Sequence, residues 1–237
     1  MIVYGRNVAE EYLKNKDQVK KIYLQEGFHD DFINSLIEKS KIPVVFKKKF
    51  ELDQLANGVH QGIIMDVVDF NYTSIDELFD KDDCFLVILD HLEDPHNFGA
   101  IIRTSEAAGV DGIVIPKDRS VEVNGTVIKT SVGASENMKI SMVTNLNKTI
   151  DELKKNGFWI VGTDMDNSTD YRKIDYSGKI ALVIGNEGNG MSRMVKESCD
   201  FIARIPMYGK VNSLNASVAA GIMIYEVIRQ KRGWNGL

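Results

Sequence analysis

Short apolar runs alternate along most of the chain with segments in which apolar residues recur at helical spacing. The runs predict strands at residues 20–24, 43–46, 62–68, 84–89, 112–115, 140–143, 158–162, 180–184 and 205–207. The helical pattern predicts helices at residues 6–15, 32–40, 50–56, 100–108, 124–132, 145–156 and 216–231. From residue 84 onward strands and helices alternate, which is typical of an α/β fold with a parallel sheet.

The segment at residues 71–82 separates two units. It is polar and acidic, and its pattern predicts only one helical turn. We therefore expect a small α/β domain at residues 1–70, a linker at 71–82 and a larger α/β domain with a parallel sheet at 83–237. The sequence shows no internal repeat and no low-complexity segment.

A glycine-rich loop, Gly185 to Gly190, follows the buried strand predicted at residues 180–184. Open α/β sheets bind ligands at the carboxyl ends of their strands, so this loop is a candidate binding site. Glu187 stands in the loop, and a carboxylate there would repel a phosphate group. We expect a ligand that is neutral or cationic at its contact point. A loop that only turns the chain remains the alternative.

The charge of the chain is unevenly distributed. The net charge is −5, yet the first fifty residues carry ten Lys or Arg against seven Asp or Glu. Part of this excess is the run Lys47-Lys48-Lys49. Such a run indicates either a solvated surface or an amino-terminal module that faces RNA. His60-Gln61-Gly62, before the last strand of this unit, is a turn by default, with docking of RNA as the alternative.

Two cysteines, Cys84 and Cys199, stand without a CxxC pattern and without clustered histidines. We expect free thiols in a reducing cytosol, and hence a cytoplasmic protein, rather than a disulfide or a metal site. The longest apolar runs have the length of strands, so we expect neither a signal peptide nor a membrane span.

Arg103 lies among apolar residues in a helix whose composition suits burial. A buried guanidinium must be paired or must face a cleft, because an unpaired buried charge is costly. An ion pair with an acid such as Glu106 and an electrostatic role at the end of the preceding loop are both open. Further along, Ser213 or Asn215 caps the last helix, which explains one of these two polar residues.

Three motifs in this chain closely resemble those of the SpoU family of RNA ribose methyltransferases, in the SPOUT superfamily. They are residues 97–103 (NFGAIIR), 184–190 (IGNEGNG) and 213–217 (SLNAS). The resemblance covers roughly residues 83–232 and implies a parallel sheet whose carboxyl-terminal segment forms a trefoil knot, in a homodimer. The amino-terminal unit is similar to the L30e-like substrate-binding domain of members that act on ribosomal RNA.

The resemblance implies methylation of a ribose 2′-hydroxyl with S-adenosylmethionine as the methyl donor and without a metal. Residues 94–97, 114–120 and 60–62 resemble the subgroup that modifies a guanosine in 23S ribosomal RNA. Another ribosomal site, a transfer RNA, and a non-catalytic RNA-binding factor of ribosome assembly are the alternatives. A nucleotide-binding α/β protein is disfavoured by Glu187.

The resemblance also implies the residues of the site. Those expected to contact or line the methyl donor are Thr163, Gly185, Ile205, Met207 and Leu214, and those expected to be catalytic are Asn97, Arg103, Glu187, Ser213 and Asn215. A guanidinium is always protonated, so we do not expect Arg103 to act as the base. We expect it to bind a phosphate and to stabilise the developing alkoxide. Asn97, Ser213 and Asn215 would orient the hydroxyl, and Glu187 would position Arg103 or Asn97.

Overall fold

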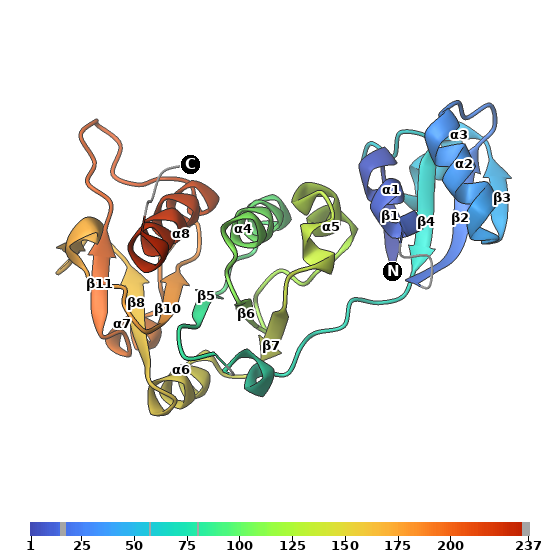
Figure 1. Cartoon of the computed structure of the whole chain (residues 1–237). Helices are drawn as coiled ribbons and strands as arrows, with labels where there is room; N and C mark the ends of the chain where they lie inside the picture. The colour runs from blue at the N-terminus through green and yellow to red at the C-terminus, as the bar shows by residue number, and fades with distance from the viewer. Residues whose placement is uncertain (15–17, 57, 80, 234–237) are drawn as a thin grey trace. The chain divides into compact units, whose positions relative to one another are not determined.

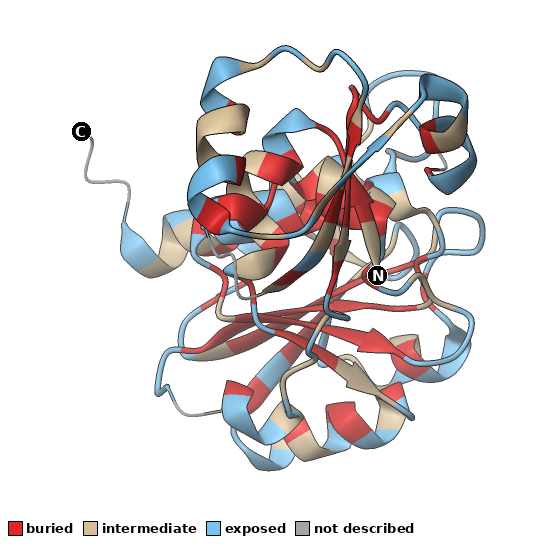
Figure 2. Cartoon of the chain, turned by 90° about the vertical axis from the view of Figure 1, so that its right-hand side faces the viewer, coloured by how far each residue is buried: buried red, intermediate tan, exposed pale blue. Residues whose placement is uncertain are grey.

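The structure is a computed structural model that describes residues 1–14, 18–56, 58–79 and 81–233 (Figure 1). The chain divides into two units. Unit 1 comprises Met1–Asn71 and Val123–Asn137, and unit 2 comprises Tyr72–Glu122 and the chain from Met138 onward. In both units the strands are largely buried and the outer faces of the helices are exposed (Figure 2).

Unit 1 is built on a four-stranded sheet in the order β1-β4-β2-β3. The strands are β1 (Ile2–Tyr4), β2 (Val19–Gln25), β3 (Val44–Lys47) and β4 (Ile63–Val67). β4 pairs antiparallel with β1 and β2, whereas β2 and β3 are parallel. β4 lies inside the sheet and is almost wholly buried, while β3 forms one edge. The predicted strands 20–24, 43–46 and 62–68 are confirmed with small shifts of their ends.

Three α-helices in the described amino-terminal part of the chain belong to this unit: α1 (Arg6–Lys14), α2 (Asp31–Ser40) and α3 (Lys49–Leu55). α2 shows why the sequence folds this way. Asp30 caps its start by accepting a hydrogen bond from the backbone N–H of Ile33, and the helix buries Ile33 and Ile37. The last residue of the predicted helix 6–15 lies outside the described residues.

A segment from the second half of the chain packs on this first sheet. It contains α5 (Gly125–Ser131) and a short 3-10 helix, η3 (Ala134–Glu136). The absence of a side chain at Gly125 permits this packing, since a Cβ there would lie 2.2 Å from the carbonyl oxygen of Ile2. The hydroxyl of Tyr12 donates a hydrogen bond of 2.7 Å to Glu136.

Unit 2 is built on a seven-stranded sheet in the order β7-β6-β5-β10-β8-β11-β9, and every pair of neighbours is parallel. The strands are β5 (Phe85–Leu89), β6 (Gly112–Pro116), β7 (Ile140–Val143), β8 (Phe158–Thr163), β9 (Thr169–Asp170), β10 (Lys179–Ile184) and β11 (Phe201–Arg204). All residues of β5 and β6 are buried. The predicted mixed α/β architecture with a parallel sheet is confirmed.

Helices cover both faces of this sheet. α4 (Pro95–Ala108) and α8 (Ala216–Arg232) pack against each other. α6 (Leu146–Lys155) and α7 (Arg193–Glu197) contribute Leu153 and Val195 to a core cluster with strand residues such as Ile160. Two 3-10 helices, η2 (Ile75–Leu78) and η4 (Tyr171–Lys173), complete the unit. None of the described helices combines the length and the apolar character that a membrane span requires.

Two predicted elements were misplaced. The helix predicted at 100–108 begins at Pro95, because Asp94 caps it and proline suits the first helical position. Asn97 therefore lies in the first turn of α4 and not in a loop. The strand predicted at 205–207 is also wrong. The strand is β11, which ends at Arg204, and the proline at 206 has no backbone N–H for a sheet hydrogen bond.

Both cysteines are free thiols. Cys84 is buried and Cys199 is half-buried, and their sulfur atoms contact the carbonyl oxygens of Leu78 and Val195 at 3.1 and 3.3 Å. Burial raises the pKa of each thiol to about 12. Because the thiolate is the reactive form, neither sulfur is activated.

We predict that neither thiol of the folded protein reacts appreciably with iodoacetamide at mildly alkaline pH, and that both react once the chain is unfolded in guanidinium chloride. Mass spectrometry of the alkylated protein measures this. Rapid labelling of Cys84 in the folded protein would contradict the burial described above.

Candidate functional site

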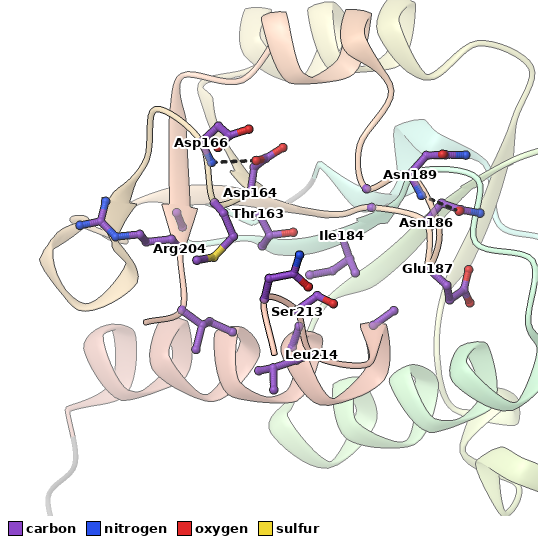
Figure 3. Close-up of a pocket in the computed structure, with 18 of the residues that line it drawn as sticks. Thr163, Asp164, Asp166, Ile184, Asn186, Glu187, Asn189, Arg204, Ser213 and Leu214 are labelled. Atoms are coloured by element: carbon purple, nitrogen blue, oxygen red, sulfur yellow. Dashed lines mark hydrogen bonds between the residues drawn. The ribbon is translucent and has the colours of Figure 1, made fainter. Parts of the chain in front are cut away.

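A cavity of about 540 Å³ opens at the carboxyl ends of β8, β10 and β11 (Figure 3). Thr163 ends β8, Ile184 ends β10, and Arg204 ends β11, and all three line the cavity. The segment before α8 closes another side of it with Ser213 and Leu214. This is the edge at which parallel α/β sheets bind their ligands.

The glycine loop after β10 forms one wall. Asn186 and Gly190 exchange two backbone hydrogen bonds of 2.9 and 3.0 Å, so the loop folds back on itself. Gly185 packs against the backbone of Gly190 and Met191, at the other end of the loop. A Cβ on this residue would stand 2.3 Å from the carbonyl carbon of Gly190 and 2.4 Å from the nitrogen of Met191. The sequence therefore needs glycine at this position for the loop to close.

A buried carboxylate fastens this loop to the loop after β5. Asp90 is 1% exposed, and its Oδ2 accepts a hydrogen bond of 2.5 Å from the backbone N–H of Ser192. Its Oδ1 lies 2.6 Å from Nδ1 of His91. The amide of Asn186 donates to the carbonyl oxygen of His91 at 2.7 Å. Hydrogen bonds near both ends of the glycine loop thus join it to the loop after β5.

Sequence reasoning missed Asp90, Asn186 and Ser192. A signal was available for Asp90, since it directly follows the buried strand and stands at the sheet edge where ligands bind. Nothing in the sequence pattern indicated that its carboxylate would hold a backbone N–H on the other loop.

Three side chains of the predicted site form a hydrogen-bonded chain. Asn215 Nδ2 donates to Asn97 Oδ1 at 2.9 Å, and Asn97 Nδ2 donates to Glu187 Oε1 at 3.0 Å. Asn97 is buried, and Asn215 also caps α8 by accepting hydrogen bonds from the backbone N–H groups of Ser217 and Val218. Of the two partners expected for Glu187, Asn97 is the one in contact. One residue from each motif therefore meets at this point.

Arg103 is exposed and not buried as expected. Its side chain forms no hydrogen bond or ion pair with any residue that the structure describes. The expectation of burial was wrong because α4 buries Ile101 and Ile102 on one face and turns Arg103 to the solvent. Arg103, like Asn97 and Asn215, is not among the described residues that line the cavity, whereas Glu187 and Ser213 are.

All five residues expected at the methyl donor line the cavity: Thr163, Gly185, Ile205, Met207 and Leu214. Thr163 is fixed by a hydrogen bond of 3.1 Å from its hydroxyl to the carbonyl oxygen of Val183.

Acidic side chains give part of the cavity wall a negative character. Besides Glu187, Asp164 and Asp166 line it. Burial alone would raise the pKa of Asp164, but hydrogen bonds from Lys196, at 2.8 Å, and from the backbone N–H of Asp166 lower it below its usual value. Asp164 also forms a turn through the hydrogen bond from Asp166, and the wall suits a neutral or cationic group better than a phosphate. The described residues contain no group of three His, Cys, Asp or Glu that could hold a metal ion.

Residues 84–225 match the profile of the SpoU rRNA Methylase family. The chain belongs to the SpoU family. Residues 2–73 match a second profile, described as the substrate-binding domain of RNA 2′-O ribose methyltransferases. Membership in the SpoU family identifies the chain as an RNA methyltransferase and is consistent with the trefoil knot that the resemblance implied.

Relatives of similar length support the assignment to the SpoU family. A TrmH family tRNA/rRNA methyltransferase of Staphylococcus haemolyticus is 46% identical over 239 residues, which covers 98% of this chain and 96% of the relative. A protein of the same description from Staphylococcus aureus strain COL is 47% identical, with coverages of 97% and 96%.

Solved structures share the SpoU fold. The SpoU methyltransferase AviRb of Streptomyces viridochromogenes, in complex with the cofactor AdoMet, superposes with a TM-score of 0.82 at 23% identity, over 97% of this chain and 90% of that chain. The TrmH/SpoU tRNA modifying enzyme of A. aeolicus has a TM-score of 0.57 at 35% identity, over 63% and 76% of the two chains.

We predict that Gly185→Ala distorts the glycine loop, because the added methyl group would overlap the backbone of Gly190. The expected cost in the free energy of unfolding is about 1 to 3 kcal/mol, measured by denaturant titration. Gly188→Ala is the matched control in the same loop, since its Cβ would lie 3.5 Å from its nearest neighbour, Asn186 Oδ1. Equal stability of the two variants would contradict the close approach at Gly185.

Proposed function

We propose that the chain transfers a methyl group from S-adenosylmethionine to the ribose 2′-hydroxyl of a guanosine in 23S ribosomal RNA. The observation that carries the proposal is the hydrogen-bonded chain from Asn215 through Asn97 to Glu187, which joins the three family motifs. Methylation at the 2′-oxygen is further supported by the substrate-binding profile that matches residues 2–73. Action on ribosomal RNA is supported by the description of the SpoU rRNA Methylase family, whereas the names of the relatives include both transfer RNA and ribosomal RNA.

The cavity suits this methyl donor. S-adenosylmethionine carries a cationic sulfonium and no phosphate, which agrees with the acidic residues of the wall, and Gly185 gives close access to the backbone. We assign its binding to the backbone of Gly185, Ile205 and Leu214, with Thr163 and Met207 lining the pocket. When bound, it supplies an electrophilic methyl group. The proposal includes no metal.

The amide and hydroxyl groups of three residues orient the ribose. An alcohol is a weak nucleophile, so the proton of the 2′-hydroxyl must leave as the new bond forms. In our proposal Asn97, Ser213 and Asn215 hold this hydroxyl in line for reaction. Glu187 accepts a hydrogen bond from the side-chain amide of Asn97 and so holds Asn97 in position. Positioning of this kind lowers the entropic part of the barrier.

Arg103 supplies positive charge in this proposal. Its guanidinium is exposed and lacks an ion pair with the described residues, so it is available to a phosphate of the substrate. From there it stabilises the negative charge that develops on the ribose oxygen. It does not act as the base, since it stays protonated at all relevant pH values.

We also propose a homodimer in the cytoplasm. Apolar side chains on α8 and on the segment before it are exposed, among them Tyr208 (91%), Val211 (68%) and Val218 (50%). Exposed apolar patches are typical of protein interfaces. The cytoplasmic location is supported by the free thiols.

Incubation of the protein with bulk ribosomal and transfer RNA and tritium-labelled S-adenosylmethionine tests the proposal. The expected result is label in 23S ribosomal RNA that is recovered as 2′-O-methylguanosine after nuclease digestion. Label in transfer RNA would support the transfer-RNA alternative, which the tRNA-modifying relative favours. Transfer to neither RNA would support a non-catalytic assembly factor.

We predict that Arg103→Ala lowers kcat by about 100-fold to 1,000-fold, the effect of removing one group that stabilises transition-state charge. Affinity for S-adenosylmethionine, measured by calorimetry, should stay near that of the parent, because Arg103 lies outside the cavity wall. Arg193→Ala, which removes an exposed arginine paired with Glu197, is the control. Full activity of Arg103→Ala would remove this residue from the mechanism.

The variant Arg103→Lys distinguishes a need for positive charge at this position from a need for the guanidinium group itself. Partial activity would show that positive charge is sufficient, whereas activity as low as that of Arg103→Ala would show that the planar guanidinium is required.

A further inference from the structure

Residues 39–50 of unit 1 concentrate positive charge in a chain whose net charge is −5. These twelve residues contain five lysines and no acid: Lys39, Lys41, Lys47, Lys48 and Lys49. They run from the end of α2 through β3 to the first turn of α3. We call them the basic-aromatic segment. No role in the proposed methyl transfer uses it.

The basic-aromatic segment lies at an open edge. β3 is the last strand of the sheet of unit 1, so one side of its backbone has no neighbouring strand among the described residues (Figure 1). Two large aromatic side chains are exposed here, Phe46 at 64% and Phe50 at 59%. They flank the three consecutive lysines.

Two of these lysines are available to a partner. Lys47 forms an ion pair of 3.1 Å with Glu51, and the same carboxylate accepts the backbone N–H of Lys48, which fixes the start of α3. Lys48 and Lys49 are exposed and form no ion pair with a residue that the structure describes. Two phenyl rings and two ammonium groups therefore face solvent within five residues.

This combination fits a single strand of RNA. Unpaired bases stack on exposed aromatic rings, and the phosphates beside them pair with lysines. Solvation alone explains a lysine run, but it does not explain why two phenylalanines next to that run are exposed. We propose that the basic-aromatic segment binds a single-stranded part of the RNA substrate, with bases stacked on Phe46 and Phe50 and phosphates on Lys48 and Lys49. The choice of RNA as the occupant rests on the proposed function.

A second copy of the chain is a poorer occupant. Pairing of two β3 edges would extend the sheet, but it would bring together two basic-aromatic segments, neither of which contains an acid. Like charges across neighbouring strands are destabilising, and lysines at an open edge are a known means of preventing such pairing.

Binding of a fluorescent oligouridylate to the full chain, measured by anisotropy without any methyl donor, tests the proposal. Loss of one stacked base lowers affinity by about 5-fold to 150-fold, so the affinity of Phe46→Ala and that of Phe50→Ala should each fall by a factor in that range. Phe32→Ala is the matched control. Phe32 is 57% exposed in the same unit, but it follows Asp30 and Asp31, and its removal should leave affinity unchanged.

The salt dependence separates stacking from charge. Lys48→Ala should reduce the slope of log affinity against log salt concentration by about 0.7, the value for one phosphate contact on a single strand. Phe46→Ala should lower affinity at every salt concentration and leave the slope unchanged. Duplex RNA of the same length should be insensitive to Phe46→Ala, because its bases are already stacked.

Three results would overturn the proposal. They are unchanged affinity in both phenylalanine variants, an equal loss in Phe32→Ala, and a change of sedimentation mass in Phe46→Ala, which would make the segment an interface between copies of the chain. The test is independent of catalysis. A chain that binds oligouridylate in this way but methylates no RNA would refute the proposed function alone.

Discussion

The hydrogen bonds between the loop after β5 and the glycine loop after β10 hold the candidate site together. β5 and β10 are neighbours in a parallel sheet, so their carboxyl ends lie side by side. The buried carboxylate of Asp90 uses this proximity to hold the backbone of Ser192. Separating the loops would leave Oδ2 of this buried carboxylate without its donor, at a cost of about 1 to 3 kcal/mol. The meeting of Asn97 with Glu187 depends on the same arrangement.

Local signals in the sequence were sufficient for most elements of the fold and insufficient for the way they are assembled. The apolar run after Asp83 predicted β5, since a short continuous apolar run is typical of a strand buried on both faces. The start of α4 was misplaced because its first turn is polar, and the cap at Asp94 was read as loop. The packing of α5 on the sheet of unit 1 depends on the missing side chain of Gly125, a contact between residues far apart in the chain.

The sequence motifs were sufficient to predict which side chains of the candidate site lie together. Asn97, Glu187 and Asn215 were expected together, and they form one hydrogen-bonded chain. The role of Asp90 could not be read from sequence, because its main partner is a backbone N–H on another loop. The exposure of Arg103 depends on which face of α4 meets the sheet and α8, and an apolar composition on nearly all sides of a helix leaves that face undetermined.

The central claim is that these loops form one site that methylates a ribose 2′-hydroxyl in ribosomal RNA. Mapping of 2′-O-methylated nucleotides in 23S ribosomal RNA, from cells with and without this protein, tests it most directly. The account predicts that one guanosine loses its methyl group in the absence of the protein and regains it when the gene is restored. An unchanged methylation map of 23S ribosomal RNA would contradict the account.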